Sequence, residues 1–560
     1  MTTDTTSLSD GQALPMSDAF PVVWQDPADE KMTWFQESAH FPETVSPLDF
    51  SVLIQAMRHG INYAAKEYEL GFSEHYRQFN TFVYRTFEVH PLPPEEMARQ
   101  EARSDRTLDA AINELGNRWA EQWLPEIKSY LAAWQACDLD ALTLPELLTH
   151  FEESLSRHQR LWEIHFLIFY PMLLALQAFD ELCAELLQDS DQFSAYDLLA
   201  GPNQTTKGDV TLWQLSRQAL TVPAIEQCLT HSSTAQVYAA LEQSPPGQNF
   251  SEALQTYLQT YGLCSDKTSL AAPYWIEEPI PIFQRLRTYM AQPDRDLRAE
   301  MVEKASKRAA KLVTVRAALA GYPAPVIAEF DRLQTAAEVA YRLSEDHHYW
   351  IDGQGNYYMR QRLLAVGRRL VELKMIETVD DVFYLTIDEI KSAATAAPTQ
   401  VYQSIVAEQR AQEARFTNST PLPLVGAPQE EEYDDPFSRS LEKFFGGPPP
   451  MSTVEDELAG YAGSPGIVSG TARVVRALAE ADGLQPGDIL VTSTTTPAWT
   501  ALFATIAAVV TDSGGVLSHC AVVAREYGLP AVVGAGMATA VIVDGQLIEV
   551  NGHTGVVRFL

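Results

Sequence analysis

The stretch TDSGGVLSHCAVVAREYGLP, residues 511–530, decides how the C-terminal part of this sequence folds. An apolar segment passes through a glycine pair, Gly514 and Gly515, to a serine and a histidine at the start of a predicted helix over 518–527. A helix start offers free backbone N–H groups and the positive end of the helix dipole, which suit a bound anion. His519 can therefore carry a phosphoryl group, or it can be a capping residue in an ordinary strand–turn–helix.

The chain of 560 residues is strongly acidic, with 40 Lys and Arg against 74 Asp and Glu and a formal net charge of −34. Nucleic-acid binding needs a basic face that neutralises phosphates, so this balance argues against a nucleic-acid partner. It argues equally against attachment to an anionic membrane. Hydrophobic residues make up 46% of the chain, which is enough to bury a large core in more than one domain.

Neither the N-terminus nor the cysteines indicate an exported protein. The first twenty residues contain no basic segment followed by an apolar one, so no secretory signal is visible. The most apolar stretch, residues 161–179, is interrupted by Glu163, His165, Pro171 and Gln177, which favours a buried helix over a membrane span. The five cysteines form no CxxC pair, so neither a disulfide framework nor a cysteine zinc site is indicated. We expect a cytoplasmic protein.

The periodicity of apolar residues divides the chain into four parts. Residues 1–20 are polar and predicted to be disordered, and residues 21–415 show the three- and four-residue spacing of helices. Residues 416–455 are rich in proline, glycine and acidic residues and predict a linker, with a long surface loop as the alternative. Short apolar strands with glycine turns fill 456–560. The predicted fold is thus multidomain: a large, mainly α-helical domain followed by a smaller α/β domain.

Four segments of the C-terminal part, in fixed order, carry a family resemblance. They are GSPGIVSGTARVV (463–475), LQPGDILVTSTTTPAWTALF (484–503), VVTDSGGVLSHCAVVAREYGLPAVVG (509–534) and DGQLIEVNGHTGVV (544–557). Together they resemble the swivelling phosphohistidine domain shared by phosphoenolpyruvate synthase, pyruvate phosphate dikinase, rifampin phosphotransferase and phenylphosphate synthase. The resemblance implies that His519 is the catalytic residue, because the phosphorylated histidine of this family follows Gly-Gly-x-x-Ser.

The residues around this histidine fit such chemistry. Gly514 and Gly515 leave the backbone free to approach a phosphoryl group. Ser518 can cap the helix or hydrogen-bond the phosphate. Arg525, nearly two turns further on, can contact phosphate or pair with a surface acid. An imidazole nitrogen such as that of His519 is a competent nucleophile near neutral pH and a good leaving group, as a phosphoryl relay requires.

Two domains of these relatives have no counterpart that we recognise in the sequence. No β/α barrel for pyruvate follows the swivelling domain, and such a barrel needs roughly 200 residues or more. No glycine-rich nucleotide motif precedes residue 456. The resemblance to phenylphosphate synthase implies that a separate ATP-grasp subunit binds ATP and Mg²⁺ and charges His519, giving a covalent phosphohistidine intermediate.

The helical part carries a more diffuse resemblance. VVWQDPADEKMTWFQESAHFPETVSPLDF (22–50) and RLSEDHHYWIDGQGNYYMRQRLLAVGRRLVELKMIETVDDVFYLTIDEI (342–390) are similar to parts of the substrate domain of rifampin phosphotransferase-like and phenylphosphate synthase-like proteins. This similarity implies that the helical domain binds the phosphoryl acceptor.

Transfer of a phosphoryl group to a hydroxyl needs cationic groups and a base. The candidate acceptor-site residues are Arg342, Glu345, Asp346, His347, His348, Arg360 and Arg362. For the cluster at 342–348, a salt-bridged helix face is the structural alternative. Metal ligation by a histidine and a carboxylate of this cluster would need a further partner that the sequence does not place, so we predict no metal site.

These observations predict a carrier and acceptor subunit of an ATP-dependent phosphotransferase. It would pass a phosphoryl group through His519 to the hydroxyl of a small substrate that is phenolic or an enolisable aromatic compound. The family resemblance implies that ATP is converted to AMP and phosphate. Two alternatives stay open: an antibiotic or polyketide phosphotransferase subunit, and a non-enzymatic phosphocarrier or regulatory subunit.

Overall fold

The structure is a computed structural model, and it describes most of the chain. The described residues are 20–560 without 39, 188–194, 200, 232–233, 394–399, 418, 429–441, 444, 448, 451, 453, 455, 477 and 496. Most of the predicted disordered N-terminus and the centre of the predicted linker therefore lie outside the described residues. Phe20, which we placed in the disordered segment, is instead buried in a small aromatic core.

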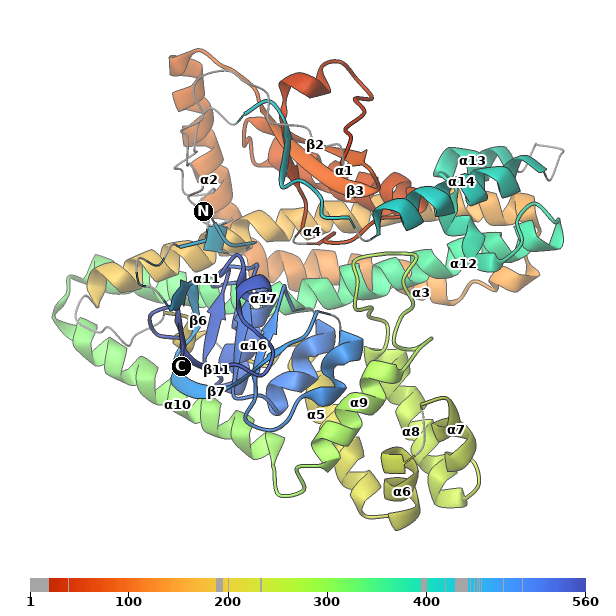
Figure 1. The fold of residues 1–560 in the computed structure, drawn as a ribbon. Coiled ribbons are helices and arrows are strands. Elements are labelled where there is room, and N and C mark those ends of the chain that lie inside the picture. Colours follow the sequence, from red (N-terminus) through yellow and green to blue (C-terminus); the bar gives the residue numbers. More distant parts are fainter. Residues whose placement is uncertain are drawn as a thin grey trace, which may run out of the picture.

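The first three quarters of the chain form a helical body (Figure 1). Its described α-helices are α1 (Gln55–Glu67), α2 (Pro94–Arg118), α3 (Leu124–Gln135), α4 (Leu144–Leu186), α5 (Gln204–Leu220), α6 (Pro223–His231), α7 (Thr234–Leu241), α8 (Pro245–Tyr261), α9 (Ile280–Met290), α10 (Leu297–Ala318), α11 (Ala324–His348), α12 (Asn356–Glu372), α13 (Ile387–Ala393) and α14 (Gln400–Phe416).

The body is organised around α4, a helix of 43 residues that packs against α1, α2, α11 and α12. A capping box between Thr143 and Glu146 begins it, and Pro171 lies inside it. Within the described part of the chain, α4 alone is long and apolar enough to cross a membrane, but 72% of its most apolar window is buried inside the protein. Its apolar character therefore serves the core of the body, as the sequence predicted.

A four-stranded sheet at one edge of the body was not predicted. Its strands are β1 (Thr33–Gln36), β2 (Phe72–Phe79), β3 (Phe82–Val89) and β4 (Leu424–Gly426), in the order β2-β3-β1-β4. Both strands next to β1 pair with it in antiparallel register, with Phe35 opposite Arg85 and Trp34 opposite Val425. The prediction of a linker beginning at residue 416 was wrong for 424–426, because β4 completes this sheet of the body.

The C-terminal domain is the predicted α/β unit. Its described elements are β5 (Glu457–Ala459), β6 (Tyr461–Ser464), β7 (Ile467–Val474), β8 (Ile489–Thr492), β9 (Ala508–Thr511), α16 (His519–Tyr527), β10 (Ala531–Val533), α17 (Ala538–Val541), β11 (Leu547–Asn551) and β12 (Val556–Phe559). They form one sheet in the order β5-β12-β11-β7-β8-β9-β10-β6. Strands β7, β8, β9 and β10 are parallel, and the other neighbouring pairs are antiparallel.

The C-terminal domain is docked on the helical body, below the long helices and between α10 and α9 in Figure 1. Leu517, in the loop before α16, and Val522 of α16 join the main core of the body. On another side of α16, Val523 and Ala524 share a core with residues of α5, α8 and α9. The two domains share buried apolar surface in these cores, so this arrangement is a packed interface.

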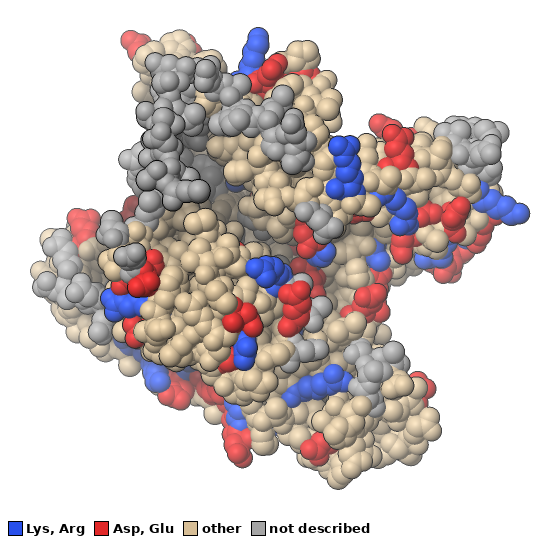
Figure 2. Space-filling model, viewed as in Figure 1, with Lys and Arg blue, Asp and Glu red and all other residues tan. Residues whose placement is uncertain are grey.

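The surface carries charges of both signs. Lys, Arg, Asp and Glu side chains are interspersed over the face shown in Figure 2.

Candidate functional site

His519 is the first residue of α16, directly after the loop that follows β9. This loop lies at the carboxyl ends of parallel strands, the edge where α/β sheets bind ligands. Ser518 has extended backbone angles, and its Oγ accepts a hydrogen bond from Ala521 N at 3.4 Å, so it caps the helix. The sequence prediction of a helix beginning at the serine–histidine pair is confirmed.

The glycine pair lets another part of the chain approach closely. Gly514 has φ = +106°, a conformation that only glycine adopts without strain. A Cβ at Gly515 would lie 2.2 Å from the carbonyl oxygen of Lys443 and 2.4 Å from that of Glu442. Backbone hydrogen bonds join Leu517 N to Lys443 O at 2.7 Å and Gly514 N to Phe445 O at 3.2 Å. In the docked arrangement, backbone of the predicted linker occupies the side of the loop that the glycines leave free. Phosphate binding by the glycines stays a prediction.

A carboxylate of the helical body faces the histidine. Glu345 Oε1, from α11, lies 3.6 Å from Nδ1 of His519, whose side chain is 17% exposed. The other carboxylate oxygen of Glu345 accepts a hydrogen bond from Thr205 at 2.8 Å, and Thr500 Oγ1 lies 3.4 Å from His519 Nε2. Burial would raise the pKa of Glu345, but His519 and Thr205 lower it to about 2. An ionised carboxylate therefore faces Nδ1 and leaves Nε2 as the nitrogen that can accept a phosphoryl group.

Polar contacts hold α16 against the body. The Arg525 guanidinium donates to the carbonyl oxygen of Val516 in the histidine loop and lies over the ring of Tyr196 at 4.7 Å. Tyr527 donates to Asp209 of α5 at 2.9 Å, and the other oxygen of Asp209 is paired with the buried Arg285. Arg525 thus supports the loop and the interface, which is the structural role that the sequence left open for it.

The remaining residues of the predicted 342–348 cluster point in different directions. Arg342 is exposed. Asp346 accepts a hydrogen bond from Gln204 N at 2.8 Å, where α5 begins, and burial raises its pKa. His347 contacts the carbonyl oxygen of Leu343 through Nδ1, and burial and the neighbouring His165 lower its pKa to about 3. His348 Nδ1 lies 3.5 Å from Asp352 Oδ2. Of this cluster, Glu345 is the residue whose contact with His519 the structure shows.

Two further predicted acceptor-site residues, Arg360 and Arg362, are bonded inside the helical body. Arg360 is buried and bound to Glu277 at 2.9 Å and to the carbonyl oxygen of Leu270 at 2.8 Å. Arg362 is fully buried, where it donates to Ser154 Oγ at 3.1 Å and to the carbonyl oxygen of Trp134 at 2.9 Å. Burial lowers the pKa of Arg362 to about 10. Both guanidinium groups satisfy backbone and side-chain acceptors inside the body, so they are structural.

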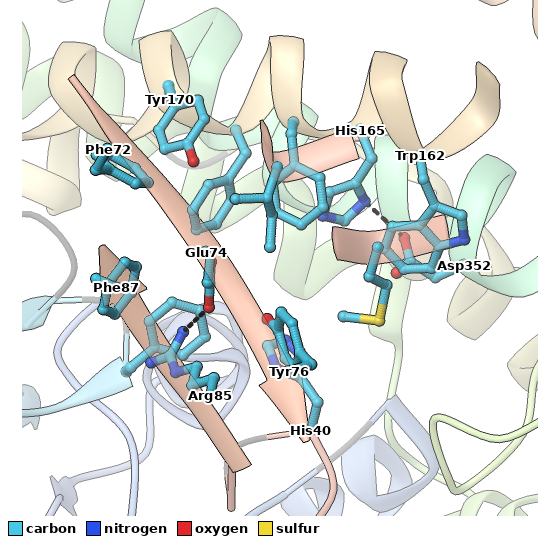
Figure 3. A pocket seen from close by; sticks show the side chains of 15 residues that line it. His40, Phe72, Glu74, Tyr76, Arg85, Phe87, Trp162, His165, Tyr170 and Asp352 are labelled. Atoms are coloured by element: carbon cyan, nitrogen blue, oxygen red, sulfur yellow. Dashed lines mark hydrogen bonds and ion pairs between the residues drawn. The ribbon is translucent and has the colours of Figure 1, made fainter. Parts of the chain in front are cut away.

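A cavity lies between the first sheet, α4 and the linker (Figure 3). Its lining is aromatic and charged: His40, Met57, Ile61, Phe72, Glu74, Tyr76, Arg85, Phe87, Trp162, His165, Phe166, Phe169, Tyr170, Asp352 and Phe445. Glu74 and Arg85 are paired at 3.4 Å on adjacent strands. Phe445 comes from the predicted linker, and its ring contacts His40 at 5.5 Å and Phe169 at 6.1 Å. The cavity encloses about 50 Å³, room for a water molecule or two in this docked state.

Beside the cavity, His165, His347 and Asp352 bring their ligand atoms within 4.8 Å of one another. His165 Nδ1 lies 3.2 Å from Asp352 Oδ2. Burial would raise the pKa of Asp352, but His165 and His348 hold it well below its usual range. His165 and Asp352 were not among the residues that the sequence predicted for a site. A signal was present, because a histidine inside the apolar stretch 161–179 is out of place in a helix that only fills a core.

Comparison with known proteins agrees with this architecture. The PEP-utilising enzyme mobile domain matches residues 484–555, and the rifampicin phosphotransferase fourth domain matches residues 165–342. The chain therefore contains the mobile domain of PEP-utilising enzymes joined to the fourth domain of rifampicin phosphotransferases, and the predicted resemblance is confirmed.

Among individual proteins, chondramide synthase cmdD of Chondromyces crocatus is 40% identical over 557 residues, 98% of this chain and 14% of that protein. The uncharacterised phosphotransferase YvkC of Bacillus subtilis is 26% identical over 538 residues, 93% of this chain and 61% of YvkC. A rifampicin phosphotransferase of Streptomyces sviceus is 28% identical over 433 residues, 76% of this chain and 48% of that enzyme. The chain thus spans between 14% and 61% of the length of these three curated relatives.

Proposed function

We propose that this chain is a phosphotransferase that carries a phosphoryl group on His519 and delivers it to a hydroxyl bound in the helical body. The observation that carries the proposal is the contact between His519 of the mobile domain and Glu345 of the body, 3.6 Å apart and almost enclosed. A histidine that served only its own domain would not need a buried carboxylate from the other one.

The position of Glu345 favours transfer away from the histidine. When the P–N bond at Nε2 breaks, its electron pair stays on the imidazole, and a proton on Nδ1 makes that imidazole a better leaving group. An ionised carboxylate beside Nδ1 stabilises this protonated form. The acceptor oxygen forms the new bond to phosphorus, and the hydroxyl proton passes to a base of the cavity wall.

The cavity beside the linker supports an aromatic acceptor. Aromatic side chains from α4 and the first sheet form most of its wall, and Arg85 supplies a cation for developing negative charge. Phe445 is hydrogen-bonded through its carbonyl to Gly514 of the histidine loop, so the cavity and the loop share one linker segment. The chemical character of this lining suits a phenolic or enolisable aromatic substrate. Because the cavity as it stands has room for only a water molecule or two, such a substrate would enter only while Phe445 is out of its place.

The acceptor has a second candidate class, an antibiotic or polyketide. The names rifampicin phosphotransferase and chondramide synthase among the relatives favour this class. In either case we propose that ATP, with Mg²⁺, is the original phosphoryl donor and that a separate ATP-grasp subunit charges His519. The match to the mobile domain of PEP-utilising enzymes supports the phosphohistidine intermediate of this proposal.

The test is to phosphorylate the full chain with potassium phosphoramidate and locate acid-labile phosphate by mass spectrometry and ³¹P NMR. We expect one phosphate on His519, none there in His519→Ala, and wild-type labelling in His553→Ala, which removes the exposed histidine of the same domain. The charged protein is then mixed with phenol or with rifampicin, and phosphate on either product identifies the acceptor class. Labelling of His519→Ala to the wild-type level would refute the carrier role, and charged protein that phosphorylates neither compound would favour a regulatory phosphocarrier.

A further inference from the structure

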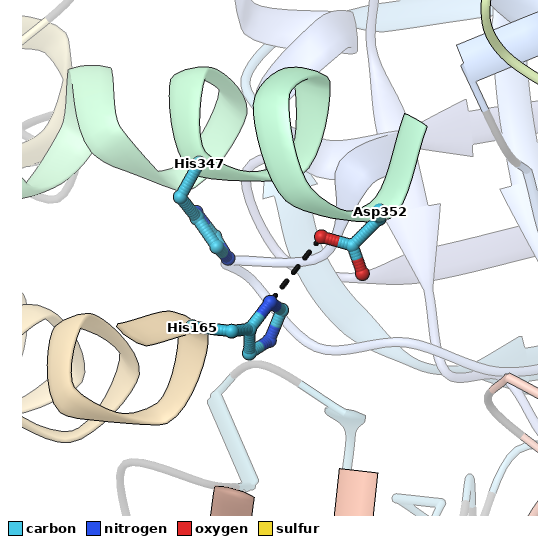
Figure 4. A group of neighbouring side chains, drawn as sticks. All are labelled: His165, His347 and Asp352. Atoms are coloured by element: carbon cyan, nitrogen blue, oxygen red, sulfur yellow. Dashed lines mark ion pairs between the residues drawn. The ribbon is translucent and has the colours of Figure 1, made fainter. Parts of the chain in front are cut away.

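Three potential metal ligands converge beside the cavity (Figure 4). His165 projects from α4, His347 from the end of α11, and Asp352 from the π-helical stretch Tyr349–Gly355 that joins α11 to α12. A π-helical turn inside a helix often marks a functional position. Here it brings Asp352 round to face the two imidazoles, and all three ligand atoms lie within 4.8 Å of one another.

The hydrogen bonding around His347 prepares a ligand nitrogen. Its Nδ1 contacts the carbonyl oxygen of Leu343, so that nitrogen carries the proton and Nε2 keeps a free lone pair. A metal-binding histidine ordinarily donates its other N–H to a carbonyl or a carboxylate in this way. The ring of His347 lies 4.6 Å from that of His165, centroid to centroid, which is close enough for both to bind one ion.

Two atoms of the group lack a proper hydrogen bond. His165 Nδ1 and Asp352 Oδ2 are both fully buried and lie 3.2 Å apart, yet neither makes a hydrogen bond of acceptable geometry with any described residue. Buried polar atoms are almost always satisfied, and the exceptions point to an unseen water or ion. An ion between these atoms and His347 would satisfy both at once.

We propose that His165, His347 and Asp352 bind a divalent transition-metal ion of the Zn²⁺ class. Two imidazoles and one carboxylate suit Zn²⁺ or Co²⁺ better than Mg²⁺, which prefers oxygen ligands. Ligands at about 2.0–2.2 Å from a tetrahedral ion lie roughly 3.3–3.5 Å apart, so small side-chain rotations bring the three atoms into place.

Three protein ligands leave a coordination position open. His165 and Asp352 both line the cavity, so the open position faces the space proposed for the acceptor (Figure 3). This part of the inference rests on the proposed function: an ion there would polarise the acceptor hydroxyl and lower its pKa, which replaces a strong base with a Lewis acid. His348, which contacts Asp352 from the solvent side, would orient the carboxylate.

The test uses the full chain, freed of metal with a chelator and titrated with Co²⁺ and Zn²⁺. We expect one equivalent of Co²⁺ to bind and to give the visible absorption bands of a low-coordinate site, with displacement by Zn²⁺. Asp352→Asn and His165→Gln should each weaken binding at least tenfold. His59→Gln is the control, because His59 also pairs with a carboxylate, Glu163 at 2.8 Å, but is exposed and remote from the three ligands in sequence; its affinity should equal that of wild type.

Anomalous diffraction at the zinc edge from wild-type crystals gives a second readout that needs no variant to fold. A peak between the three side chains is expected, and a peak elsewhere or no stoichiometric binding would overturn the metal site. Unchanged affinity in both ligand variants would overturn it as well. Phosphoramidate labelling of His519 is measured without the metal, so a failure of the metal site and a failure of the carrier role are separate results.

Discussion

We expect Glu526 to make the free energy of unfolding dependent on pH. This residue of α16 is half-buried, and its Oε1 atom is fully buried without a hydrogen-bond partner among the described residues. Burial and the nearby Glu345 raise its pKa from an ordinary 4.5 to about 7, although Lys304, Arg308 and Arg525 oppose the shift. Between pH 4.5 and about 7, the folded protein therefore holds a proton on Glu526 that the unfolded chain releases.

The size and sign of the effect follow from linkage. Because the pKa of Glu526 is higher in the folded protein, the contribution of Glu526 to the free energy of unfolding is fully present below pH 4.5. This contribution is lost as the pH rises to about 7. The interval between 4.5 and about 7, at about 1.4 kcal/mol per pH unit, sets an upper value of about 3.5 kcal/mol on the change in the free energy of unfolding. Solvent screening at a half-buried side chain reduces this to about 2 kcal/mol. Glu526→Gln removes the titration, so we expect it to stabilise the protein by about 2 kcal/mol at pH 8 and hardly at all at pH 4.5.

The measurement is urea unfolding followed by tryptophan fluorescence at pH 4.5, 6 and 8, on wild type, Glu526→Gln and Glu252→Gln. Glu252 is exposed on α8, so its variant should follow wild type at every pH. The stability difference between Glu526→Gln and wild type should grow with pH and level off above about pH 7. A difference that is constant across pH, or a destabilised Glu526→Gln at pH 8, would refute the reasoning.

Two further variants test the histidine loop and its partner. Gly515→Ala places a Cβ 2.2 Å from the Lys443 carbonyl oxygen, so it should lower the free energy of unfolding, measured in urea, by about 2 kcal/mol. Gly483→Ala is the control and should leave the free energy of unfolding unchanged, because no atom lies within 4 Å of its new Cβ. Equal effects of the two variants would contradict the close approach of the linker. Glu345→Gln removes the charge beside His519 Nδ1, so phosphohistidine prepared with phosphoramidate should hydrolyse about tenfold more slowly by ³¹P NMR. Glu338→Gln, exposed on the same helix, is the control, and an unchanged rate in Glu345→Gln would show that the carboxylate does not act on the leaving imidazole.

The features that local sequence encodes could be predicted. A strand, a glycine turn and a serine cap lie next to one another along the chain, and together they determine where α16 begins and which histidine it presents. The apolar stretch 161–179 similarly predicted the buried part of α4. In both cases, short-range hydrogen bonds and periodicity carry the information.

The missed features all depend on residues far apart in the chain. Strand β4 pairs with β1 across almost 400 residues of sequence. Because β4 has only three residues and lies in a segment rich in proline and acidic residues, its sequence has no periodicity that would predict a strand. Arg360 was chosen for its charge, yet its acceptors lie on a segment some 80 residues earlier. His165 and His347 likewise meet only because α4 and α11 pack together. A sequence pattern places such groups on helix faces, but it does not say which faces meet.

The shared cores of the mobile domain and the helical body set a condition on any movement between them. Leu517, Val522 and Val523 are almost completely buried in cores to which both domains contribute. If the domain leaves to collect a phosphoryl group, this apolar surface enters water at about 25 cal/mol per Å². If His519 collects its phosphoryl group at another site, an apolar surface at that site would offset the cost of exposing these side chains. Movement of the domain would then exchange one apolar docking surface for another of similar buried area. The small difference in docking free energy between the two surfaces would determine which one the domain occupies for longer.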